Sequence, residues 1–186
     1  TALHFQLHQL GYESIHAVMP TGYAKADQLS VDSLWQTLFY DNPTYCFERN
    51  TSNRPGQANG VIIGGNLSLI NDSIGTVSDI DFSNKILFIE ELDEYLYKID
   101  RMMVQLKRAG KLSHLKGLII GNMTGMRDTT VPFGSGINSL IFDHVKEYDY
   151  PVAYNIPIGH EPLNMAIPHG TICQLNVGNK VTITFE

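Results

Sequence analysis

In the stretch ILFIE, residues 86–90, four apolar residues are followed directly by a carboxylate. A short apolar run of this kind is typical of a buried β-strand, which places Glu90 at the end of a strand. Further along, the stretch IGH, residues 158–160, brings an apolar run to an imidazole through a glycine. A carboxylate and an imidazole are the orienting group and the general base of a nucleophile relay. The nucleophile itself has no convincing candidate, because GSG at 134–136 lacks the GxSxG spacing.

Similar apolar runs predict a sheet covered by helices. Strands are expected at 60–65, 85–89, 118–121, 152–155, 172–175 and 181–184, because Gly, Asn and Asp separate these short runs. The last two should form a hairpin, in which only the second strand alternates clearly. Apolar residues at helical spacing predict helices over 96–109 and 137–147. The predicted fold class is α/β with α+β character, a strand-rich domain with two or three covering helices.

The first part of the chain has a different pattern. Helical periodicity and a short apolar run predict a helix, a strand and a connecting helix, at 1–10, 13–19 and 26–39. Asn42-Pro43 then closes the connecting helix. We therefore predict a boundary near Pro43. Residues 1–43 would be the residual end of an N-terminal α/β domain whose body lies upstream, and residues 44–186 would be the C-terminal domain.

Composition limits the classes of partner. The chain has 186 residues, 43% of them hydrophobic, which is enough for one domain and part of a second. Its 13 Lys and Arg against 19 Asp and Glu give a net charge of −6, so neither nucleic acid nor an anionic membrane is expected as a partner. No apolar run approaches the roughly 18 residues of a membrane-spanning helix. Cys46 and Cys173 show no CxxC spacing, which favours a reducing compartment.

Glu90 and His160 each have a simpler explanation. Glu90 precedes further acidic residues, so it could belong to a solvated acidic turn or to the N-terminal cap of the following helix. His160 could be an ordinary surface residue of a loop. The alternative is that the two side chains meet, with the carboxylate accepting the imidazole N–H and fixing its tautomer.

Two further patterns concern ligand binding. Asn66, in the run GGNL at 64–67, could offer its amide to a substrate carboxylate or peptide group, or the two glycines could simply form a tight turn with positive φ. His4 and His8 have the i, i+4 spacing of a metal pair. Neither an HExxH arrangement nor a third ligand accompanies them, so we expect a structural role and predict no metal site.

A set of short segments, taken in order, is more specific than any single motif. These are GGNLSL at 64–69, GT at 75–76, ILFIEE at 86–91, YKIDRMM at 97–103, QL at 105–106, AG at 109–110, GLIIG at 117–121, PIGH at 157–160 and PHG at 168–170. Together they resemble the LD-carboxypeptidase (muramoyltetrapeptide carboxypeptidase) family of serine peptidases. The likeness runs nearly from end to end and keeps its order.

The resemblance implies roles for residues. In that family the nucleophilic Ser lies in a Gly-aromatic-Ser-Asp turn of an N-terminal α/β domain, directly before a Thr-Ala-Leu-His helix. Residues 1–4 match the start of that helix, which implies that the Ser lies shortly upstream of Thr1. Carried over by position, Glu90 is the orienting carboxylate, His160 is the general base, and Asn66 lines the substrate pocket.

The resemblance also implies a fold and a reaction. Residues 44–186 would form a swivelling β/β/α barrel-like domain, often paired as a homodimer. The family releases the terminal D-amino acid, D-Ala, from murein tetrapeptides during cell-wall recycling in the bacterial cytoplasm, through an acyl-enzyme and without metal or cofactor. A related branch cleaves microcin-type peptidyl adenylates. Glu91 and Leu92 stand where the family often has Asp and Val, which leaves the substrate preference open.

Two expectations about activity follow. Without the nucleophile, the chain by itself should be inactive. Two hypotheses from other classes remain at this point: a module that binds murein peptides without cleaving them, and a metal hydrolase built on His4 and His8.

Overall fold

The computed structural model describes all residues 1–186 and has a mixed α/β fold. Its elements are α1 Ala2–Gln9, β1 Ser14–His16, the 3₁₀ helix η1 Pro20–Lys25, α2 Gln28–Phe39, β2 Thr44–Glu48, β3 Gly56–Asn66, α3 Leu67–Ser73, β4 Ile86–Leu92, α4 Leu96–Arg108, β5 Gly117–Thr124, α5 Ile137–Val145, β6 Val152–Ala153, β7 Ile167–His169, β8 Ile172–Val177 and β9 Lys180–Phe185. Seven strands form one sheet in the order β2-β9-β8-β3-β4-β5-β6. The predicted fold class is confirmed.

The long strand β3 joins two halves of this sheet. Its first part pairs antiparallel with β8, and its last part pairs parallel with β4. The parallel half, β3 to β6, is buried on both faces, which explains why residues 86–89 read as one continuous apolar run. Strands β8 and β9 form the expected hairpin. Both of them alternate buried and exposed residues, so the expectation for the first was wrong, because Ile172 is an apolar residue on the exposed face.

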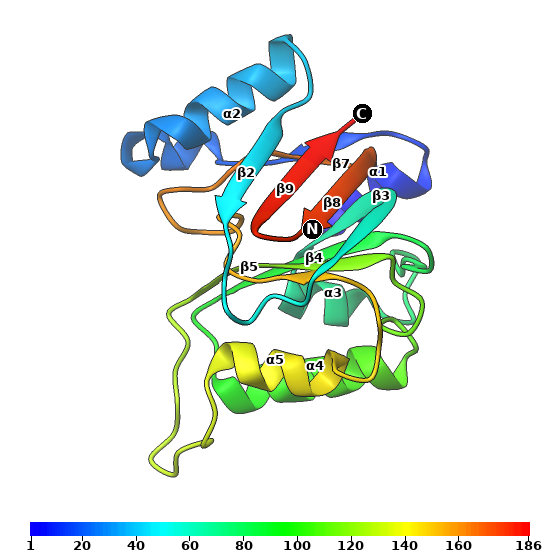
Figure 1. Ribbon diagram of the computed structural model, residues 1–186, viewed down its shortest axis with the longest axis vertical. Coiled ribbons are helices and arrows are strands. Elements are labelled where there is room, and N and C mark those ends of the chain that lie inside the picture. The colour runs from blue at the N-terminus through cyan, green and yellow to red at the C-terminus, as the bar shows by residue number, and fades with distance from the viewer.

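A hydrophobic core lies on each face of the parallel half. On one face, Leu87 and Ile89 of β4 pack with residues of α3, α4 and α5, and Phe5 of α1 joins the same cluster. On the other face, Phe88 packs with Leu175 of β8 and the rest of the antiparallel half. The sheet therefore curls so that its two halves enclose the second core. Figure 1 shows α4 and α5 side by side beyond the strands, and β8 and β9 running in a different direction from β4 and β5.

The sequence analysis missed four elements, namely η1, β2, α3 and β7. The alternative of a tight turn at Gly64-Gly65 is wrong, because β3 continues through both glycines and α3 begins directly after Asn66, its N-cap, although both glycines do have positive φ. A side chain at Gly64 would run into the backbone of Phe88 on the neighbouring strand. The glycines are therefore explained by the close approach of two strands.

The segment before Pro43 packs on the rest of the chain. Strand β1 pairs antiparallel with β7, so that Ser14 lies opposite His169. Helix α2 begins at the N-cap Asp27 and buries Ser30 and Ser33. The boundary near Pro43 stays a prediction. None of the helices combines the length and the hydrophobicity that crossing a membrane requires.

Candidate active site

Glu90 lies inside the sheet. It belongs to β4, is 1% exposed, and stands opposite Asn66 on the neighbouring strand β3. The N-cap of α4 is Tyr95. The alternative that Glu90 belongs to a solvated turn or caps that helix is therefore wrong. A carboxylate held at the carboxyl ends of parallel strands occupies the edge at which α/β sheets commonly carry their ligand sites.

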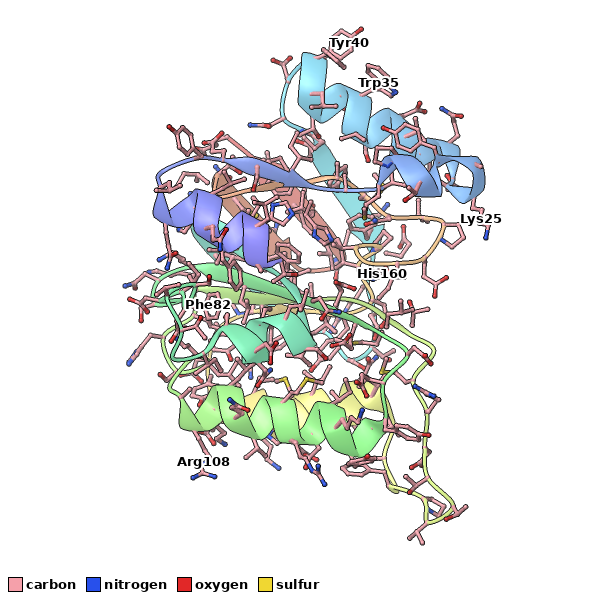
Figure 2. All side chains as sticks on the ribbon, turned by 180° about the vertical axis from the view of Figure 1, so that it is seen from behind. Lys25, Trp35, Tyr40, Phe82, Arg108 and His160 are labelled. Carbon is pink, nitrogen blue, oxygen red and sulfur yellow. The ribbon has the colours of Figure 1, made fainter.

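His160 reaches Glu90 from an irregular loop between β6 and β7. The distance from His160 Nδ1 to Glu90 Oε2 is 2.8 Å. The carboxylate side chain is 1% exposed, whereas the imidazole is 46% exposed. The structure thus brings together the two residues that the sequence singled out, one buried and the other open to solvent. Figure 2 shows His160 between the helical layer of α4 and the segment that carries α2.

Two glycines allow this close approach. A side chain at Gly121 of β5 would run into the carbonyl oxygen of Ile158 and would lie 3.2 Å from Glu90 Cβ. A side chain at Gly159 would lie 3.1 Å from Asn122 Cβ and 3.3 Å from Glu90 Oε2. Gly159 also has φ of +143°, a conformation that L side chains rarely adopt. The loop can approach β4 and β5 because both positions lack a side chain.

Burial governs the charge of Glu90. Desolvation raises the pKa of Glu90 above its ordinary value, and the neighbouring His160 opposes that rise. When the carboxylate is ionised, it accepts the Nδ1 proton of the imidazole, which leaves Nε2 as the basic nitrogen. Nε2 makes no hydrogen bond within the chain. The arrangement can therefore take a proton from a group presented at the exposed side of the ring.

Asn66 is already engaged by its neighbours. Its Oδ1 accepts from Leu69 N at 3.1 Å as the cap of α3, and its Nδ2 donates to Glu91 Oε1 at 2.6 Å. Its backbone N–H donates to Thr1 Oγ1 at 2.9 Å. The structure therefore places Asn66 beside Glu90, with one amide hydrogen left for another partner.

Glu91 is a buried polar residue whose role the sequence analysis missed. It accepts hydrogen bonds from Asn66 Nδ2, from the backbone N–H and the hydroxyl of Ser68, and from its own neighbour Leu92 N. These contacts fix the start of α3 and the side chain of Asn66. The apolar Leu92 after Glu91 indicates only that the strand continues past the two carboxylates, and nothing in the sequence marks Glu91 as buried.

The histidines of α1 and β1 form a cluster with His169 of β7. His4 Nδ1 lies 2.7 Å from Ser14 Oγ, and its ring stacks on that of His169 at 5.1 Å between centroids. His8 and His16 lie next to these rings. Burial lowers the pKa of His4 to about 4 and those of His16 and His169 to about 3. No three His, Cys, Asp or Glu side chains are arranged to hold a metal ion, so His4 and His8 gain no third ligand.

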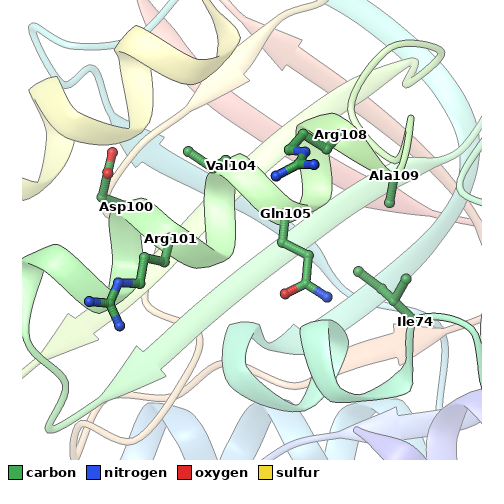
Figure 3. A pocket seen from close by; sticks show the side chains of 7 residues that line it. All are labelled: Ile74, Asp100, Arg101, Val104, Gln105, Arg108 and Ala109. Atoms are coloured by element: carbon green, nitrogen blue, oxygen red, sulfur yellow. The ribbon is translucent and has the colours of Figure 1, made fainter.

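Two hollows on the surface lie away from Glu90 and His160. One, of about 570 Å³, lies along the outer face of α4, where Gln105 and Ile74 line it together with Arg101 and Arg108 (Figure 3). The other, of about 400 Å³, lies between residues 51–55 and the start of α5. Neither contains the Glu90–His160 pair, which remains the candidate site on chemical grounds.

Comparison with known proteins identifies the family. Residues 59–175 match the sequence model of the LD-carboxypeptidase C-terminal domain. The chain belongs to the LD-carboxypeptidase family. The "Probable murein peptide carboxypeptidase" of Bacillus subtilis is 31% identical over 98% of this chain and 59% of that relative. The "Murein tetrapeptide carboxypeptidase" of Pseudomonas aeruginosa is 22% identical over 94% of this chain and 59% of that relative.

Solved structures show that the fold is that of LD-carboxypeptidases. The muramoyltetrapeptide carboxypeptidase from Oxalobacter formigenes matches with a TM-score of 0.90 at 22% identity, over 99% of this chain and 64% of that one. The microcin C7 self immunity protein MccF, in complex with aspartyl sulfamoyl adenosine, matches with a TM-score of 0.84 at 15% identity, over 100% of this chain and 64% of that one. The chain spans 59% of the length of the two carboxypeptidase relatives named above.

Proposed function

We propose that the whole protein is a serine-type LD-carboxypeptidase that releases terminal D-Ala from murein tetrapeptides in cell-wall recycling. Glu90 and His160 would be two members of a Ser-Glu-His triad. The observation that carries this proposal is the 2.8 Å separation between Glu90 Oε2 and His160 Nδ1. A buried carboxylate bonded to a half-exposed imidazole is the base-and-orienter unit of serine hydrolases.

The proposed reaction assigns one task to each residue. A Ser hydroxyl attacks the carbonyl of the L,D-peptide bond, and His160 Nε2 takes its proton and gives it to the departing D-Ala amine. Glu90 holds the imidazole in the Nδ1–H tautomer and stabilises the imidazolium. Water then hydrolyses the acyl-enzyme with His160 again as the base. No other residue of this chain is needed for proton transfer.

The Ser would come from a part of the whole protein outside these 186 residues. One contact supports this view. Thr1 Oγ1 accepts from the backbone N–H of Asn66, which stands opposite Glu90 in the sheet. Thr1 therefore lies beside the site, and a residue preceding it in the whole protein would enter that site.

Asn66 would line the substrate pocket. Its Nδ2 donates to Glu91, so one amide hydrogen is left for a substrate carboxylate or peptide carbonyl. Because Glu91 and Leu69 hold the amide at both ends, its orientation is fixed before substrate arrives. Such preorganisation lowers the entropy cost of binding.

The test uses the full-length protein and a muramoyl tetrapeptide. Released D-Ala is measured for the wild type, Glu90→Ala, His160→Ala and the control His114→Ala, which changes an exposed imidazole. Triad variants should lose about 10³-fold or more in kcat/KM. Near-normal release by both Glu90→Ala and His160→Ala would reject the proposal. His114→Ala should stay close to wild type.

A second substrate class remains within the proposal. The fold likeness to MccF, solved with a sulfamoyl adenosine ligand, supports a test of peptidyl adenylates. The same enzyme is assayed with both substrates, and a kcat/KM for the adenylate above that for the tetrapeptide would assign it to the microcin-type branch. Tight binding of a tetrapeptide without any cleavage by the full-length protein would instead favour a non-catalytic binding module.

We further propose that the 186-residue chain alone is inactive, since base and orienter without a nucleophile give no covalent route. Turnover of a tetrapeptide by the purified chain contradicts this. The protein acts in the cytoplasm, and it forms a homodimer, which sedimentation of the full-length protein tests directly.

A further inference from the structure

The loop that carries His160 has no helix or strand of its own between β6 and β7. Its first part is held by the sheet, since Ile156 N donates to Ile120 O at 3.1 Å and Asn122 N donates to Ile158 O at 2.7 Å. These bonds end just before Gly159 and His160. Something else must fix the backbone at the histidine itself, because an irregular segment is otherwise mobile.

A chain of hydrogen bonds supplies this support from α2. Gly159 N donates to Asn164 Oδ1 at 3.0 Å, and Asn164 N donates to Ser30 Oγ at 2.7 Å. The Ser30 hydroxyl in turn donates to Pro162 O at 3.0 Å. Two consecutive links therefore connect α2 to the residue directly before His160, and a third hydrogen bond ties the same Ser30 hydroxyl to the loop at Pro162. In Figure 2 the loop lies beneath α2, with His160 at its lower side.

The side chains of Ser30 and Asn164, which form this series of hydrogen bonds, are deeply buried. Ser30 is 0% exposed and Asn164 is 6% exposed. Ser30 lies in the first turn of α2. Alanine has a higher helix propensity than serine and a similar volume. A buried hydroxyl costs free energy unless its hydrogen bonds are made, and here it both donates and accepts. Packing and helix formation therefore do not account for a serine at this position.

We infer that Ser30 and Asn164 are positioning residues for His160, so that α2 sets the geometry of the Glu90–His160 pair. They touch neither substrate nor reacting atoms and act through the backbone of Gly159. The consequence for catalysis rests on the proposed function, whereas the effect on the imidazole does not. Helix α2 lies outside residues 59–175, the part that matches the family's C-terminal domain.

Ser33 offers a matched control on the same helix. It is buried like Ser30, and its hydroxyl also bonds the loop, since Ala166 N donates to Ser33 Oγ at 3.0 Å. That bond lies at the far end of the loop, away from Gly159. Ser33→Ala thus removes an equally buried hydroxyl and frees one loop N–H without breaking the route to His160.

The first test measures the tautomer of His160 in the 186-residue chain. Ring ¹⁵N shifts are recorded by NMR above the pH at which the imidazole titrates, and His160→Gln assigns the signal. Ser30→Ala and Asn164→Ala should lower the ratio of Nδ1–H to Nε2–H tautomer by about fivefold or more, whereas Ser33→Ala should change it by less than about twofold. If Ser30→Ala does not fold, Ser30→Cys provides a near-isosteric replacement with a weaker acceptor.

Two results overturn the inference. One is an unchanged tautomer ratio in folded Ser30→Ala and Asn164→Ala. The other is an equal change in Ser33→Ala, which would mean a general structural role. Because this readout needs no catalysis, it can succeed or fail independently of the carboxypeptidase assignment.

The second test uses the full-length protein and the tetrapeptide. A displaced base should lower kcat by about 10²-fold with little change in KM, because Ser30 and Asn164 do not contact substrate. Ser33→Ala should keep kcat close to wild type. Should the full-length wild type show no carboxypeptidase activity while the tautomer shifts as expected, the positioning role stands and the proposed function fails.

Discussion

Glu90 and Glu91 are consecutive buried residues of β4 whose carboxylates lie on opposite faces of the sheet. Glu90 follows the face of Ile86 and Phe88 and bonds to His160, whereas Glu91 follows the other face and accepts hydrogen bonds from Asn66 and Ser68. Alternation along a strand produces this separation. One carboxylate therefore faces the candidate site, and the other secures the helix that begins beside it.

Replacing Glu90 with Gln should separate stability from activity. Burial raises the folded-state pKa of Glu90 above its ordinary 4.5, so its contribution to stability is fully present below that value and is lost as pH rises through the folded pKa. Glutamine removes the charge and keeps an oxygen that can accept from Nδ1. At pH 7 the thermal midpoint of the variant should therefore be higher than that of the wild type, by about 2–4 °C for each kcal/mol added to the free energy of unfolding. Tetrapeptide cleavage by the full-length variant should be lost.

Scanning calorimetry between pH 4 and 8 checks this prediction. The difference in thermal midpoint between Glu90→Gln and the wild type should grow as the pH rises. A variant that is less stable than wild type at every pH would show that the ionised pair stabilises the fold, contrary to the expectation.

Truncating Glu91 should have the opposite effect. Glu91→Ala leaves Asn66 Nδ2 and the two Ser68 donors without their acceptor inside the protein. Unsatisfied buried donors are costly, so the loss should be at least about 3 kcal/mol in the free energy of unfolding by urea. Glu94→Ala is the control, because its ion pair with Lys98 is partly exposed and contributes less than about 1 kcal/mol. Equal losses in the two variants would contradict this account of Glu91.

The sequence could reveal one of these carboxylates and not the other. Residues 86–90 mark Glu90 as the end of a buried strand, and Gly159 marks His160 as a loop residue, so local pattern and family resemblance were sufficient to select the pair. Glu91 reads from sequence as another surface acid. Its burial depends on Ser68, which lies in α3, a helix too short and too irregular in apolar spacing to be predicted.

The same limit applies to the N-terminal segment. A helix over 26–39 was predictable from its apolar spacing, and it forms as α2 over Gln28–Phe39. Its contact with Asn164, far along the chain, was not predictable, because a single hydrogen bond between distant residues leaves no periodic signal. The pairing of β1 with β7 is hidden for the same reason. Elements follow from local sequence here, whereas the support of the site follows from long-range packing.

Gly121→Ala should displace the loop that carries His160, because Gly121 of β5 lies against that loop. The added methyl would meet the carbonyl oxygen of Ile158 and approach Glu90 Cβ, so the loop before His160 must move. A displacement of about 1 Å in a catalytic group can cost on the order of 10²-fold in rate, which should appear in kcat of the full-length protein. Gly136→Ala is the control, since a methyl there meets nothing within 4 Å and replaces only an N-cap glycine. Normal kcat in Gly121→Ala would indicate that the loop adapts without moving the imidazole.

The histidine cluster should make the fold sensitive to acid. Burial holds the pKa of His16 and of His169 at about 3, far below the ordinary 6.5 that both recover on unfolding. Between these values the unfolded chain binds more protons than the folded chain, so stability is present above about 6.5 and is lost as pH falls. Each imidazole contributes a slope of at most about 1.4 kcal/mol per pH unit in that window. Other titrating groups add their own slopes, so the comparison must be made between variants.

His16→Phe isolates one of these contributions. His16 Nε2 is buried without a partner and its ring packs edge-on against Phe88 at 5.2 Å, so a phenyl ring can replace it without losing a hydrogen bond. Urea unfolding from pH 7 down to pH 4.5 should show that the free energy of unfolding falls less steeply in the variant. The difference in slope should be about the contribution of one imidazole. His114→Phe, at an exposed position, should leave the slope unchanged. Parallel slopes for His16→Phe and wild type would mean that His16 takes up a proton in the folded state, in which case its environment must open before the chain unfolds.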